Sequence, residues 1–134
     1  ILKKMIKNKK GNIINVASTY SLVSPNMNLY KGTNIFKINK PIEYIISKSF
    51  IPNYSRYLAT TYIKKGIRCN TVVPHAVIKN NKNKIFKTNF SKLSPMGRFC
   101  KPTELNGLFV FLSSDSSSYM NGSTITIDGG WTAW

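Results

Sequence analysis

The sequence predicts an α/β fold in which three parallel strands are joined by crossover helices. Three short strand-like runs occur at residues 12–17, 67–73 and 123–128, and the first two are almost continuously apolar, as in strands buried on both faces of a sheet. Segments with helical spacing separate them, at 41–62 and 102–114. Strands that alternate with helices pair in parallel through crossovers. No change in composition divides the 134 residues, so we expect one domain.

The N-terminal part predicts a helix end, a strand and a long loop. Leu2, Met5 and Ile6 have helical spacing and lysines follow them, which is typical of the last turns of a helix that ends at Gly11. The strand at 12–17 comes next. The loop at 18–40 is too apolar for simple disorder, and loops of this length in compact domains are usually functional. We therefore expect it to cover a binding pocket.

The second part predicts one long helix, a strand and a final helix and strand. Pro41 suits a first helical turn, and the KKG at 64–66 suits a helix C-terminus. Pro52 cannot donate a hydrogen bond to the carbonyl of Lys48, so a kink is expected there. Residues 75–100 read as loop or short helix, and Pro102 opens the last helix.

The charge and the cysteines exclude some classes of protein. The formal net charge is +16, but the lysines are spread from Lys3 to Lys101, whereas a nucleic-acid-binding module would gather them on one face among aromatic residues. No apolar run has the length of a membrane span and none resembles a secretory signal. Cys69 and Cys100 form neither a metal motif nor a disulfide framework. We expect a cytoplasmic protein whose partners are neither nucleic acid nor membrane.

Tyr44, Lys48 and Ser18 are the candidates for chemistry. The first two are four residues apart and so share a helical face, and Ser18 follows the first strand at the edge where parallel sheets bind ligands. An ammonium beside a phenol favours the phenolate, which suits general acid–base catalysis, and a serine hydroxyl can orient a substrate oxygen. This set suits proton transfer coupled to hydride movement on a cofactor. The alternative is a packed tyrosine beside a solvated lysine.

Four motifs together resemble the short-chain dehydrogenase/reductase family: GNIINVAS at 11–18, YIISK at 44–48, GIRCNTVVP at 66–74 and the tail from Ser94. The resemblance implies the C-terminal half of a Rossmann-like doubly wound sheet and an enzyme that interconverts an alcohol and a carbonyl with NAD or NADP. Ser18, Tyr44 and Lys48 would be catalytic, with Tyr44 as the proton donor or acceptor and Lys48 on the nicotinamide ribose. Cofactor binding would involve Tyr44, Lys48, Pro74 and Val77. A homodimer or homotetramer is also implied.

The segment LYKGTNIFKINKPIEY at 29–44 resembles the loop of a subgroup associated with bacterial surface-sugar and flagellin-glycan synthesis. This resemblance implies a sugar or nucleotide-sugar substrate with four candidate contacts: Tyr30, Gly32, Thr33 and Glu43. The alternative is that this loop only packs on itself.

Three departures from the family pattern bear on activity, and one of them is the kink expected at Pro52, which could move Lys48 relative to Tyr44. The glycine-rich phosphate loop would precede Ile1, so we interpret residues 1–134 as a partial domain that lacks the dinucleotide-binding half. His75 replaces the glycine that usually follows Pro74, and its side chain could crowd the nicotinamide; we interpret it as drift and not as a new catalytic base. An inactive remnant of a split or decayed gene is the first alternative to an enzyme, and a basic nucleic-acid-binding module, which the scattered lysines disfavour, is the second.

Overall fold

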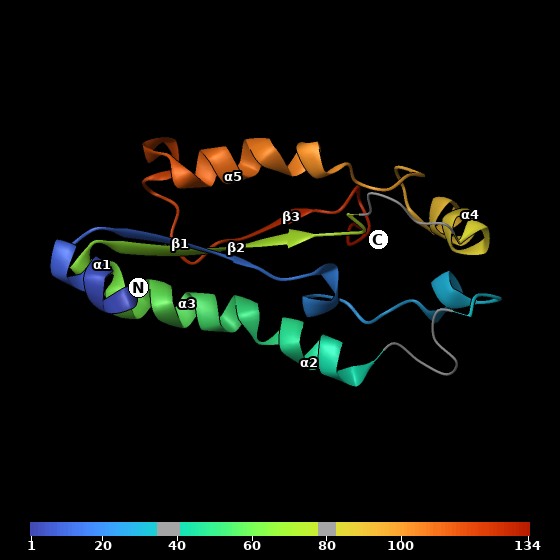
Figure 1. The fold of residues 1–134 in the computed structure, drawn as a ribbon, viewed down its shortest axis with the longest axis horizontal. Helices are drawn as coiled ribbons and strands as arrows, with labels where there is room; N and C mark the ends of the chain where they lie inside the picture. The colour runs from blue at the N-terminus through green and yellow to red at the C-terminus, as the bar shows by residue number, and fades with distance from the viewer. Residues whose placement is uncertain (35–40, 78–82) are drawn as a thin grey trace.

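A computed structural model describes residues 1–34, 41–77 and 83–134. The chain forms three layers, with α5 (Asn106–Ser113) on one face of a sheet and α1 (Leu2–Asn8) and α3 (Ile51–Tyr62) on the other (Figure 1). The sheet has the order β1-β2-β3, and its strands are Gly11–Val16, Ile67–Pro74 and Thr124–Ile127. Both pairings are parallel, which confirms the predicted fold class.

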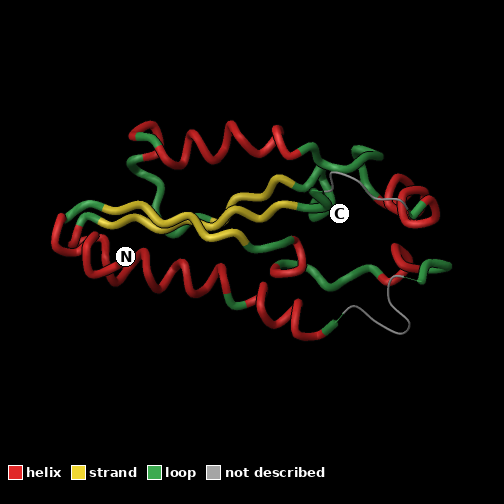
Figure 2. The backbone as a smooth tube through the Cα atoms, in the orientation of Figure 1, coloured by secondary structure: helices red, strands yellow, loops and turns green. Residues whose placement is uncertain are grey.

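The register brings the carboxyl ends of the strands to one edge. Val16 pairs with Val72, and Pro74 pairs with Ile127. The strands lie side by side between the helices (Figure 2), and the central strand β2 is the most buried of the three. The loops that leave β1, β2 and β3 therefore start close together, at the end of the molecule where α4 (Lys84–Leu93) lies.

The predicted helix at 41–62 is wrong as a single element. It is two helices, α2 (Ile42–Ser49) and α3, which meet at Phe50. The physical reason is Pro52, which lies in the first turn of α3, where its missing N–H needs no helical partner.

Three smaller differences concern element ends. The first helix ends at Lys9, which is left-handed (φ 48°), and Gly11 already belongs to β1. The segment at 75–100 contains the full helix α4, which begins where the Asn83 side chain accepts a hydrogen bond from the Phe86 N–H (2.9 Å). The final predicted helix starts with a 3-10 turn, η4 (Pro102–Leu105).

Two apolar clusters stabilise this arrangement. Leu58 and Ala59 of α3 pack on Cys69 under the sheet. The second cluster lies beyond the strand ends and joins the 3-10 turn η2 (Met27–Tyr30), α4 and the C-terminal tail; it contains Leu29, Tyr30, Phe86, Phe90 and Trp131. The second cluster builds one wall of a cavity described below. Among the described helices, none is long and apolar enough to cross a bilayer.

Candidate active site

A cavity of about 260 Å³ lies at the carboxyl edge of the sheet. Five regions supply its walls: the segment after β1, the turn η2, helix α2, helix α4 and the segment after β2. Its described lining consists of Ser18, Tyr20, Leu29, Tyr30, Tyr44, His75, Ala76, Val77, Phe86 and Phe90. Parallel sheets bind ligands at this edge, so the location agrees with a substrate site.

Ser18, Tyr44 and Lys48 come together at this cavity. Ser18 is buried just after β1, and its Oγ accepts a hydrogen bond from the Tyr20 N–H (3.3 Å). Tyr44 is 37 % exposed. The Lys48 Nζ lies 5.9 Å from the centre of the Tyr44 ring and donates to the Val16 carbonyl at 3.2 Å. Lys48 thus lies behind Tyr44, held against the end of β1, and outside the described lining.

The helix break beside Pro52 does not separate this pair. Lys48 is still in the last turn of α2, one residue before that helix ends at Ser49. The expected kink therefore falls C-terminal to both side chains and leaves them on one face.

Two hydrogen-bonded phenols form a second side of the cavity. The hydroxyls of Tyr20 and Tyr30 are 3.1 Å apart, and the Tyr20 ring meets the Tyr44 ring edge-on at 6.4 Å. Burial raises the pKa of both Tyr20 and Tyr30 above the ordinary value. Both therefore remain neutral at physiological pH and can donate or accept hydrogen bonds.

His75 occupies the same cavity and is 7 % exposed. Its Nδ1 lies 2.6 Å from the Thr19 Oγ1, and its ring stacks on Trp131 with centres 4.2 Å apart. Burial lowers the pKa of His75 to about 4, against a smaller opposing effect of the Asp128 charge. The next residue, Ala76, has a φ of 46°, which is unfavourable for a residue with a Cβ. A neutral imidazole is thus fixed on a strained turn.

The predicted cofactor and substrate residues divide into two groups. Pro74 ends β2, and Val77 lines the cavity and bridges to Cys100. Of the predicted sugar contacts, Tyr30 lines the cavity. Gly32, Thr33 and Glu43 lie outside its described lining, and the Thr33 hydroxyl bonds back to the Tyr30 carbonyl (2.8 Å). Residues 35–40 of that loop lie outside the described residues.

The sequence prediction missed the aromatic part of the lining. Phe86 and Phe90 are four residues apart and follow the capping residue Asn83, which is a helix signal that could have placed them on one face. Tyr20 and His75 gave no such signal, because only the fold brings them together.

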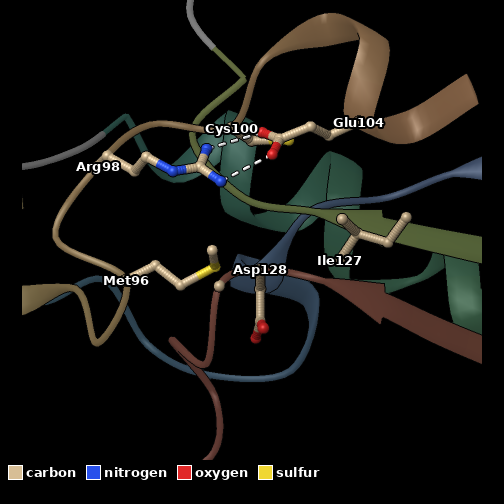
Figure 3. Close-up of a pocket in the computed structure, with 7 residues that line it drawn as sticks. Met96, Arg98, Cys100, Glu104, Ile127 and Asp128 are labelled. Carbon is tan, nitrogen blue, oxygen red and sulfur yellow. Dashed lines mark hydrogen bonds and ion pairs between the residues drawn. The ribbon is translucent and has the colours of Figure 1, made fainter.

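A second cavity of about 100 Å³ lies beside the end of β3 (Figure 3). Arg98 makes two hydrogen bonds to the Glu104 carboxylate, at 2.7 and 2.8 Å, and these lower the pKa of Glu104 to about 2. The Asp128 carboxylate points away from that pair and accepts hydrogen bonds from Gly130 and Thr132 instead. Within the described residues, no cluster of potential ligands could hold a metal ion.

Comparison with known proteins places this geometry in a family context. A family model described as enoyl-(acyl carrier protein) reductase matches residues 1–132. The chain is 29 % identical over 143 residues to 2-keto-3-deoxy-L-fuconate dehydrogenase of Xanthomonas campestris, which covers 98 % of this chain and 43 % of that protein. It is 31 % identical to D-threitol dehydrogenase of Mycolicibacterium smegmatis, over 97 % of this chain and 46 % of that protein.

A solved structure is similar to this chain in both sequence and fold. The short chain dehydrogenase of Leptospira borgpetersenii, with bound NAD+, superimposes with a TM-score of 0.85 at 31 % identity and covers 97 % of this chain and 48 % of that one. The chain thus spans about half the length of the relatives that it matches.

Proposed function

The chain belongs to the short-chain dehydrogenase/reductase family, and on this basis we propose that it carries the catalytic residues of an NAD- or NADP-dependent oxidoreductase that interconverts an alcohol and a carbonyl. The observation that carries the proposal is the convergence of Ser18, Tyr44 and Lys48 from two separate segments on one cavity edge. The serine and the tyrosine line the cavity, and the lysine supports the tyrosine from behind.

The donors present here suit the nicotinamide end of a dinucleotide. The Lys48 ammonium has three N–H groups, and the Val16 carbonyl accepts from one of them. The others and the Tyr44 hydroxyl match the hydroxyl groups of a ribose, and Pro74 and Val77 lie at the strand end beside them. A bound nicotinamide would supply or accept the hydride.

The chain's own residues account for the proton. Tyr44 gives a proton to the substrate oxygen during reduction and takes it back during oxidation. The Lys48 charge stabilises the phenolate that Tyr44 becomes when its proton leaves. Ser18 orients the same substrate oxygen by a hydrogen bond from its hydroxyl. Because Lys48 is held by Val16, its charge stays on the tyrosine side of the cavity.

We propose a sugar-like alcohol or polyol as the substrate. The name of D-threitol dehydrogenase supports a polyol, and that of 2-keto-3-deoxy-L-fuconate dehydrogenase, which refers to a sugar acid, supports a sugar-like substrate more broadly. Tyr30 would contact such a substrate inside the cavity. Gly32, Thr33 and Glu43 would contribute only to a longer substrate that leaves the cavity, such as the nucleotide-sugar of the surface-sugar subgroup.

Two further features extend the proposal. Large apolar side chains are exposed on α2, α3 and α5, among them Ile46, Tyr57 and Val110, as expected of surfaces that pair in a homodimer or homotetramer. Both cysteines are free thiols, which favours a reducing compartment such as the cytoplasm.

The Tyr44→Phe variant of the intact protein tests the proposal. We expect kcat/KM for polyol oxidation, followed as NADH or NADPH formation, to fall by about 10²- to 10⁴-fold because the proton-transferring hydroxyl is lost. Dinucleotide affinity should fall much less. Tyr57→Phe, at an exposed position on α3, is the matched control and should retain activity. Wild-type turnover by Tyr44→Phe would refute the assignment.

A further inference from the structure

The His75 side chain connects three segments that leave the carboxyl edge of the sheet. His75 follows β2, and its Nδ1 lies 2.6 Å from the Oγ1 of Thr19, in the segment after β1. Its ring stacks on Trp131, in the segment after β3, with centres 4.2 Å apart. Thr19 and His75 are both buried, so water does not compete for the hydrogen bond between them. This bond therefore fixes the segment after β1 against the segment after β2.

The two segments that the bond joins are those of the proposed chemistry. Thr19 directly follows Ser18, and the N–H of Tyr20, the next residue, donates to the Ser18 Oγ at 3.3 Å. A shift of Thr19 would move both Ser18 and the N–H that orients its hydroxyl. On the other side, His75 lies two residues before Val77, which the proposed function assigns to the cofactor. The bond thus sets the distance between the group that orients the substrate and the segment that receives the cofactor.

His75 is held in this position at a cost to folding. Its Nε2 is buried and has no hydrogen-bond partner among the described residues, and Ala76 beside it has the unfavourable φ of 46°. Unsatisfied and strained groups of this kind cluster at functional sites. Because the buried Nε2 cannot reach a ligand, the functional part of His75 is its bond to Thr19.

We propose that His75 is a positioning residue, which through Thr19 holds the Ser18 hydroxyl at the distance from the cofactor segment that the reaction requires. It transfers no proton and makes no bond to the substrate. A misplacement of an orienting group by about 1 Å can lower the rate by about 10²-fold. The inference rests on the proposed function, because it adds a residue to the same site.

Two substitutions of Thr19 separate the hydrogen bond from the space that the side chain fills. Thr19→Val replaces the hydroxyl by a methyl group of similar size and removes the bond to His75. Thr19→Ser keeps the hydroxyl and is the matched control. In the intact protein, kcat and KM for D-threitol oxidation are measured together with dinucleotide affinity. The kcat is expressed per dinucleotide-binding site, so that unfolded protein does not count.

We expect the kcat of Thr19→Val to fall by about ten- to a hundredfold, and its dinucleotide affinity to change by less than about threefold. Thr19→Ser should keep at least about a third of the wild-type kcat. If the bond were purely structural, Thr19→Val would reduce the number of binding sites and leave kcat per site unchanged. That result, or equal losses of kcat in the two variants, would overturn the inference.

A double variant covers the case in which Thr19→Val does not fold. Thr19→Val combined with His75→Leu replaces both bonded groups by apolar ones, a change that can be nearly neutral for stability. The kcat of this folded double variant should stay at least about tenfold below that of the wild type. Recovery of kcat together with stability would contradict the inference.

Amide NMR of the intact protein gives a readout that needs no turnover. Thr19→Val should shift the amide resonance of Val77, which lies across the lost bond, whereas Thr19→Ser should leave it nearly unchanged. A Val77 resonance that does not move in Thr19→Val would overturn the inference even in an inactive protein. Failure of the Tyr44 test therefore does not affect this result, and failure here does not affect the Tyr44 test.

Discussion

The two cavities at the carboxyl edge of the sheet differ in the charge and the hydrogen bonding of their polar groups. Around the smaller cavity, Arg98, Glu104 and Asp128 direct their hydrogen bonds to protein groups. The walls of the larger cavity are mostly aromatic, and its described lining holds no Asp, Glu, Lys or Arg. The smaller cavity therefore carries more charge, whereas the polar groups of the larger one are neutral hydroxyls and a neutral imidazole.

The difference shows that charge alone is a poor guide to a ligand site. A carboxylate that accepts two hydrogen bonds from one guanidinium has little left to offer a ligand, and an exposed pair of this kind contributes little to stability. Neutral hydroxyl groups in an aromatic cavity can donate or accept hydrogen bonds without the cost of burying a charge. The comparison therefore favours the larger cavity for the proposed chemistry and a structural role for the charged groups of the smaller one.

Among variants at the two cavities, we expect Phe90→Ala to reduce stability the most. Phe90 is 2 % exposed and stacks on Phe99 at 4.4 Å between ring centres, so its loss leaves a void in the wall of the larger cavity. The free energy of unfolding should fall by about 3–5 kcal/mol in urea denaturation. Met96→Ala is the control at the smaller cavity. Because Met96 is 56 % exposed, its loss should be below about 1 kcal/mol. Similar losses for both variants would remove the distinction between the two walls.

The next largest expected effect is a fall in the free energy of unfolding at low pH, caused by protonation of His75. Its pKa is about 4 in the folded chain and near 6.5 when unfolded, so the unfolded state binds the proton first as the pH falls. The stabilising contribution is complete above pH 6.5, declines as the pH falls toward 4, and changes no further below that. A difference of about 2.5 pKa units corresponds to a loss of up to about 3 kcal/mol.

The other titratable groups facing His75 do not act in this window. Tyr20 stays neutral, and the pKa of Asp128 is lowered by its hydrogen bonds from Thr132 and Gly130, so its contribution is lost only at lower pH. In urea denaturation at several pH values between 6.5 and 4.5, the free energy of unfolding of the wild type should fall with decreasing pH. The His75→Gln variant should lack this slope. A variant with the same slope as wild type would place the titration elsewhere.

Local rules predicted the elements well, because strand composition and helix spacing are properties of short segments. The first two strands follow from their apolar runs, and the crossovers follow from the alternation of strands with helices. The pair Tyr44 and Lys48 was predictable because a spacing of four places two side chains on one helical face. Pro52 showed where the helix would be disturbed, although only the structure shows that it breaks at Phe50.

The rest of the candidate site depends on contacts between distant segments. Thr19 contacts His75, which is 56 residues away in the sequence, and Tyr30 of η2 contacts Phe86 of α4. No local pattern marks such contacts. The interpretation of His75 as drift rests on the family's glycine alone, because no local pattern reveals Thr19 and Trp131, which the fold brings to it. The Thr33 hydroxyl bonds to the Tyr30 carbonyl of its own turn, and residues 35–40 of that loop lie outside the described residues, so the substrate contacts of the loop stay a prediction.

The smallest expected effect belongs to Arg98→Gln, and it is the sharpest test of the structural role of the smaller cavity. Arg98 and Glu104 are 44 % and 37 % exposed, so solvent screens their attraction, and Glu104 keeps its hydrogen bond from the Lys101 N–H when Arg98 is lost. The melting temperature should fall by a few degrees at most, and by less at high salt. Turnover should not change.

Glu104→Gln, which keeps an acceptor for the Lys101 N–H, is the matched variant. The double variant should lower the melting temperature no further than the more destabilising of the two single variants. A destabilisation as large as that of Phe90→Ala, or loss of polyol turnover, would mean that the paired charges do more than hold the segment 98–104 together, and the contrast between the two cavities would fail.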